Sequence, residues 1–120
     1  MRLMLIGSNA SRPEGLRVML RFHALHVAED AEGALAVMRE GKRFDAVLCD
    51  LRKGAIDASE LHAAIARARP ELAGRVVFVT DERCTPKARL FLEIHRSVHK
   101  PFDRADVERA LMPFDPLPLL

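Results

Sequence analysis

Apolar residues along the chain alternate between short continuous runs and longer runs with helical spacing. The short runs fall at residues 3–6, 24–28, 45–50, 75–80 and 97–99. The first of them, Leu3-Met4-Leu5-Ile6, is apolar at every position, which is typical of a strand in a sheet covered on both faces. The pattern predicts five short strands.

The longer runs predict a helix after each strand, because each begins at a good capping residue. The predicted caps are Ser11, Asp30, Asp57 or Ser59, Thr85 and Asp103. Five strand-then-helix units without a hairpin signal predict an α/β fold, a doubly wound five-stranded parallel sheet with helices on both faces. The expected domain covers residues 1–112, and residues 113–120 form a Pro-rich apolar tail.

Composition narrows the class of protein. The chain has 120 residues, 49% of them hydrophobic, which fits one domain with a single core. The net charge is +2 and the basic residues are scattered among acids, so no nucleic-acid binding is expected. No apolar run approaches the roughly 18 residues that a membrane span needs. Two cysteines without a signal peptide indicate a cytoplasmic protein without a disulfide framework.

Three polar residues mark the ends of the predicted strands: Asp50, Thr80 and Lys100. In open parallel sheets, functional residues gather at the carboxyl ends of the strands. A carboxylate on which a hydroxyl and a lysine converge can accept and hold a phosphoryl group, provided that a cation offsets the oxygens.

These residues resemble the receiver domains of bacterial two-component response regulators, which have a flavodoxin-like (βα)5 fold. The resemblance covers about residues 2–112 and rests on three segments in the family's order, FDAVLCDL at 44–51, VFVT at 77–80 and KPF at 100–102. Residues 76–102 are most similar to the receivers of hybrid histidine kinases. Since the sequence stops just after the fifth predicted helix, we expect a stand-alone receiver.

The resemblance implies a role for each of these residues. Asp50 would accept a phosphoryl group from the histidine of a kinase or phosphotransfer protein, Thr80 would hydrogen-bond a phosphoryl oxygen, and Lys100 would neutralise another. Residues 85–112 would contact a downstream protein. We expect a monomer or weak homodimer, and no enzyme activity beyond phosphorylation and dephosphorylation at Asp50.

The sequence departs from the family where receivers hold Mg²⁺. Gly7 and Ser8 replace the usual pair of acids after the first strand. The remaining ligands would be Asp50, the main-chain carbonyl of Arg52 and the degenerate position Ser8, with Asp81 or Glu82 as a candidate replacement carboxylate. Losing two charged ligands is expected to weaken Mg²⁺ binding by several kcal/mol, since a hydrogen bond to a charged group contributes about 1.5–3 kcal/mol. Ser97 also replaces the family's aromatic switch residue.

Two interpretations remain open. The first is a pseudo-receiver that acts through protein contacts, with weakened or absent phosphorylation at Asp50. The alternative is a fully functional phospho-accepting response regulator in a phosphorelay. A small enzyme on the same fold is less favoured, because residues 7–11 lack the glycine spacing of a phosphate-binding loop.

Overall fold

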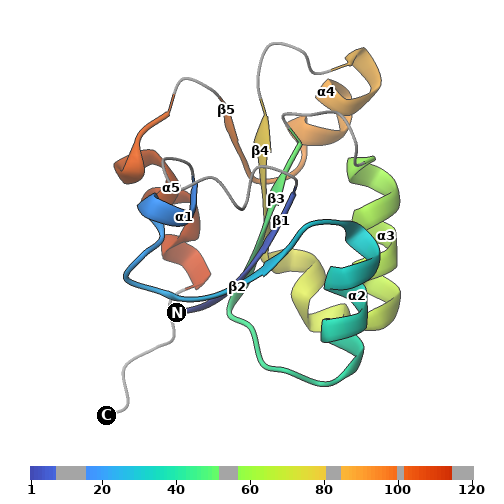
Figure 1. Cartoon of the computed structure of the whole chain (residues 1–120). Helices are drawn as coiled ribbons and strands as arrows, with labels where there is room; N and C mark the ends of the chain where they lie inside the picture. The colour runs from blue at the N-terminus through green and yellow to red at the C-terminus, as the bar shows by residue number, and fades with distance from the viewer. Residues whose placement is uncertain (8–15, 52–56, 81–84, 100–101, 115–120) are drawn as a thin grey trace.

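The computed structural model describes residues 1–7, 16–51, 57–80, 85–99 and 102–114. Within these residues, five strands form one sheet in the order β2-β1-β3-β4-β5 (Figure 1). All four neighbouring pairs are parallel. The strands are β1 (Arg2–Ile6), β2 (Ala24–Ala28), β3 (Ala46–Asp50), β4 (Val76–Thr80) and β5 (Ser97–His99). This arrangement confirms the predicted doubly wound α/β fold.

The three central strands are buried on both faces. Every residue of β3 and β4 is buried, and so are the last four residues of β1. Side chains along each strand alternate between two apolar layers. Met4 and Phe78 belong to the layer with α2 (Ala31–Arg39) and α3 (Ala58–Ala68). Leu5 and Val79 belong to the layer with α1 (Leu16–Met19) and α5 (Arg104–Leu111). Burial on both faces explains why these strands are apolar at nearly every position.

Five α-helices in the described part of the chain cover the sheet. They are α1 (Leu16–Met19), α2 (Ala31–Arg39), α3 (Ala58–Ala68), α4 (Pro86–Glu93) and α5 (Arg104–Leu111). In Figure 1, α1 and α5 lie on one side of the sheet, and α2 and α3 on the other. The described residues also form two 3-10 helices, η1 (Pro70–Arg75) and η2 (Met112–Phe114). No helix among the described residues has both the length and the apolar character needed to cross a membrane.

Side-chain caps begin four helices at predicted positions. Asp30, Asp57, Thr85 and Asp103 each accept a hydrogen bond from the backbone N–H three residues further on, at 2.7 to 3.1 Å. The sequence left Asp57 and Ser59 open as the third cap, and Asp57 is the cap observed. Each such cap contributes on the order of 1 kcal/mol.

Some boundaries differ from the sequence-based expectation. The first helix ends at Met19, so His23 lies in the turn beyond it. The predicted cap Ser11 lies outside the described residues. Arg75 was expected to begin the fourth strand but ends η1, and its guanidinium donates a hydrogen bond to the carbonyl of Asp45 at 3.2 Å. This hydrogen bond directs the Arg75 side chain toward the start of the neighbouring strand, β3.

Ring contacts hold α4 against β4 and α3. The ring of His95, just after α4, stacks on Phe91 with their centroids 4.0 Å apart, and the ring of His62 on α3 lies 4.6 Å from that of His95. Phe78 of β4 meets Phe91 edge-on at 5.5 Å. Partial burial, and then the neighbouring His62, lower the pKa of His95 from its ordinary value of 6.5.

The lowered pKa of His95 predicts that acid weakens the fold. The unfolded chain binds a proton at this histidine more readily than the folded chain, so its contribution is complete above about pH 6.5 and is lost below it. His95→Phe keeps a ring for stacking but removes the titration. In denaturant unfolding between about pH 8 and about pH 5, we expect a smaller loss of stability in this variant than in the wild type. Equal losses in both proteins would contradict this assignment.

Candidate functional site

Asp50 and Thr80 end neighbouring strands at the carboxyl edge of the sheet. Asp50 is the last residue of β3 and is 6% exposed, and Thr80 is the last residue of β4 and is 5% exposed. The register pairs Asp50 with Val79, and the N–H of Leu51 donates to the carbonyl of Val79 at 2.8 Å. Two of the three predicted phosphoryl-binding residues therefore lie at adjacent strand ends.

The two side chains reach this edge from opposite faces of the sheet. Because side chains alternate along a strand, Asp50 shares the face of Leu48, in the layer with α1 and α5. Thr80 shares the face of Phe78, in the layer with α2 and α3. A group bound above the edge can be contacted from both sides.

The other predicted site residues lie outside the described residues: Ser8, Arg52, Asp81, Glu82 and Lys100. Lys100 directly follows His99, and the register pairs His99 with Thr80. The roles assigned to these five residues remain predictions.

Gly7 follows β1 and packs directly against Asp50. Its φ is +146°, and its N–H donates to the carbonyl of Ala28 at 3.0 Å. A Cβ added at this position would lie 2.8 Å from the Cβ of Asp50 and 3.1 Å from its carbonyl oxygen. Side chains rarely adopt this φ, and no Cβ fits at this distance without movement of the backbone. The backbone therefore requires glycine at one of the two positions where the family has acids.

The described residues do not make a magnesium site. They contain no group of three or more His, Cys, Asp or Glu side chains that could hold a metal ion. At this edge they supply the carboxylate of Asp50, and the close approach of Gly7 leaves no room for a side chain at position 7. Mg²⁺ is usually held by one or two carboxylates together with waters and phosphate oxygens, so the described residues supply only part of such a site.

Cys49 precedes Asp50 and belongs to the opposite apolar layer. Burial, and then the negative charge of Asp50, raise the pKa of its thiol far above the ordinary value. Because the thiolate is the reactive form of cysteine, Cys49 is not a nucleophile. It is a small core residue.

A hollow of about 280 Å³ lies beside Thr80, between α4 and β5. Its lining includes Ser97 and His99 from β5, and Arg89 and Glu93 from α4. Sequence reasoning noted Ser97 as a missing aromatic residue but did not identify this hollow. The sequence spacing could have indicated it. Ser97 and His99 are two residues apart and share one face of a strand, and Arg89 and Glu93 are four residues apart and share one face of a helix.

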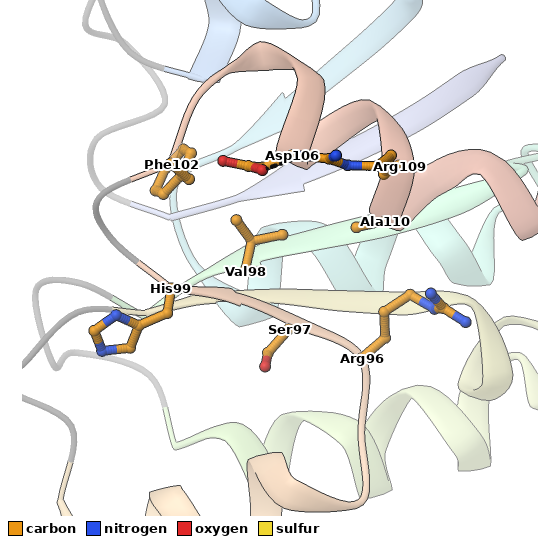
Figure 2. Close-up of a pocket in the computed structure, with 8 residues that line it drawn as sticks. All are labelled: Arg96, Ser97, Val98, His99, Phe102, Asp106, Arg109 and Ala110. Atoms are coloured by element: carbon orange, nitrogen blue, oxygen red, sulfur yellow. Dashed lines mark hydrogen bonds and ion pairs between the residues drawn. The ribbon is translucent and has the colours of Figure 1, made fainter.

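A second groove, of about 450 Å³, runs between β5 and α5. Figure 2 shows Val98 pointing toward α5, while Ser97 and His99 point away from it. The carboxylate of Asp106 pairs with Arg109 of the same helix. β5 is an edge strand, and both of its faces are bordered by grooves.

Comparison with known proteins identifies the fold. No family model matches the chain, and no curated protein matches it. Solved structures do match. A response regulator receiver domain from Clostridium thermocellum has a TM-score of 0.76 and 16% identity, covering 94% of this chain and 92% of that one.

Two further structures have equally high similarity. The receiver domain of a sensor histidine kinase from Pseudomonas aeruginosa, with a magnesium ion coordinated in its active site cleft, has a TM-score of 0.75 and 20% identity over 94% of this chain and 95% of its own. A protein described as adenylate cyclase from Rhodopirellula baltica has a TM-score of 0.77 and 19% identity over 94% of this chain and 85% of its own. The chain has the flavodoxin-like fold of receiver domains.

The contact between Gly7 and Asp50 predicts that Gly→Ala substitutions at different positions destabilise the fold by different amounts. We expect Gly7→Ala to lower the free energy of unfolding by about 2–5 kcal/mol, because it combines backbone strain with a steric contact. Gly41 has φ +87° but no atom near its missing Cβ, so Gly41→Ala should cost about 1 kcal/mol from strain alone.

Gly74 provides the matched control for this series. It has neither a positive φ nor a neighbour within 4 Å, so Gly74→Ala should change stability by less than about 0.5 kcal/mol. Urea unfolding measures all three variants. Equal costs for Gly7→Ala and Gly41→Ala would show that the Asp50 contact is not tight.

Proposed function

We propose that this protein is a receiver module of two-component signal transduction that acts through protein contacts, with weakened or absent phosphorylation at Asp50. One observation carries the proposal. The buried Asp50 ends β3 beside Thr80 in a receiver fold, whereas the adjoining end of β1 is a glycine with no room for an acid. On this proposal, Asp50 would keep the phospho-acceptor position while part of the metal ligation would be lost.

The chemistry assigned to Asp50 is phosphoryl transfer. A carboxylate oxygen of Asp50 would attack phosphorus, the bond from phosphorus to the partner's histidine nitrogen would break, and an acyl phosphate would form. The hydroxyl of Thr80 would donate a hydrogen bond to a phosphoryl oxygen. Lys100 would place its positive charge on another oxygen.

Negative charge limits this reaction. Asp50 and the incoming phosphoryl oxygens repel one another, and transfer depends on groups that offset their charge. Mg²⁺ supplies such an offset where it binds, but the described residues contribute one carboxylate to it. The lysine and the hydroxyl would then carry most of the stabilisation, which makes transfer slow.

The surface formed by α4, β5 and α5 is the proposed contact surface. It includes the groove between β5 and α5 (Figure 2) and the exposed side chain of Leu90 on α4, which is 66% exposed. An exposed large apolar side chain on this surface favours protein contacts. The partners would be a histidine kinase or phosphotransfer protein and a downstream protein.

Labelling of the full chain with acetyl phosphate tests this proposal. At millimolar Mg²⁺, intact-mass spectrometry should show phosphoryl addition at least about tenfold slower than in a receiver with the acid pair, a difference of about 1.4 kcal/mol or more in activation free energy. Asp50→Asn is the matched control and should remove whatever labelling occurs. Labelling at Asp50 as fast as in the conventional receiver would overturn the proposal and establish the fully functional alternative.

A further inference from the structure

A hollow of about 500 Å³ opens at the end of the sheet opposite to Asp50 and Thr80. It lies beside Val76, the first residue of β4, whereas Thr80 is the last. Its lining comes from α3, η1, β4, η2 and the loop between α4 and β5, and consists of His62, Ala73, Gly74, Val76, Ile94, His95, Arg96 and Phe114. Hollows of this volume are typical of sites for small molecules.

The polar side chains in this hollow are nitrogen bases and a cation. Nε2 of His62 donates to the carbonyl of Ala73 at 2.8 Å, because a carbonyl oxygen only accepts. The ring of His95 lies 4.6 Å from that of His62, and Arg96 follows it in the chain. No carboxylate is among the lining residues.

Arg96 has an aromatic neighbour rather than an acidic one. Its guanidinium carbon lies 5.5 Å from the ring centroid of Phe114, and that of Arg75 lies 5.8 Å from the same ring. Arg75 also donates to the carbonyl of Asp45. Among the described residues, no carboxylate forms an ion pair with Arg96, and the nearby Asp106 pairs with Arg109 (Figure 2).

Apolar surface completes the hollow. The side chain of Ile94 is 82% exposed, Val76 is buried, and the ring of Phe114 is partly buried. We propose that this hollow binds a small organic anion, with its charged group at Arg96 and His95 and an apolar ring against Ile94 and Phe114. A carboxylate or phosphate suits a guanidinium through charge-assisted hydrogen bonds, and a ring covers apolar surface that is otherwise exposed to water.

Proton binding at His95 gives the proposed site a pH dependence. Partial burial, and then His62, lower the pKa of His95. Besides His62 on α3, the charged groups near His95 are Glu93 and Arg96 in its own segment and Arg75 at the end of η1. A bound anion would favour the protonated form of His95, so the affinity should increase as the pH falls from about 8 to about 6.

This site does not depend on phosphorylation of Asp50, and its Arg96 also lines the groove between β5 and α5. It lies at the amino ends of β4 and β5, and phosphorylation of Asp50 neither requires nor supplies it. Loss of anion binding at this hollow would therefore leave labelling at Asp50 unchanged, and loss of labelling at Asp50 would leave anion binding unchanged.

Phenyl phosphate is the probe for a titration of the full chain followed by backbone amide shifts. We expect saturable shifts at Ala73, Gly74, His95 and Arg96, with inorganic phosphate and phenol each binding at least about tenfold more weakly, because each offers only one of the two contacts. Arg96→Gln should weaken phenyl phosphate binding at least about fivefold, a loss in the range found for a hydrogen bond to a charged group.

Arg17→Gln is the control for this variant. Arg17 is exposed on α1, outside the hollow, and its substitution changes the net charge equally, so binding should be unaltered. Absence of saturable shifts, equal binding of inorganic phosphate and phenyl phosphate, or equal weakening by both substitutions would each overturn the proposal.

Discussion

The close approach of Gly7 to Asp50 is the constraint on which the candidate site depends. β1 and β3 are paired in parallel, so their carboxyl ends meet, and the backbone after β1 passes against the Cβ of Asp50. A side chain at position 7 would meet the Cβ of Asp50, and position 7 is one of the two at which the resemblance to receivers implies an acid.

The parallel sheet also gives its two ends different chemistry. All five strands run in one direction, so every carboxyl end lies at one edge and every amino end at the other. Asp50 and Thr80 lie at the first edge, whereas Arg75, Arg96 and His95 gather at the second. The two ends of the sheet therefore offer different groups to a ligand, a carboxylate and a hydroxyl at one end and cationic and histidine side chains at the other.

Much of the fold follows from the sequence because its signals are local. Continuous apolar runs identified the strands, Asp30 and Thr85 identified helix starts, and Asp50 and Thr80 were placed at strand ends. Contacts between distant segments could not be predicted. The approach of Gly7 to Asp50 joins residues 43 positions apart, and the contact of Arg96 with Phe114 depends on how η2 packs. Neither has a periodic or capping signal, so both emerge only from packing.

The central claim is that the edge of the sheet beside Asp50 binds Mg²⁺ weakly because β1 contributes no acid. A Mg²⁺ titration of the full chain, followed by the backbone amides of Gly7, Asp50 and Leu51, measures this property directly. The account predicts a dissociation constant weaker than about 1 mM, equivalent to a binding free energy less favourable than about −4.1 kcal/mol. Saturable binding well below that concentration, abolished by Asp50→Asn, would contradict it.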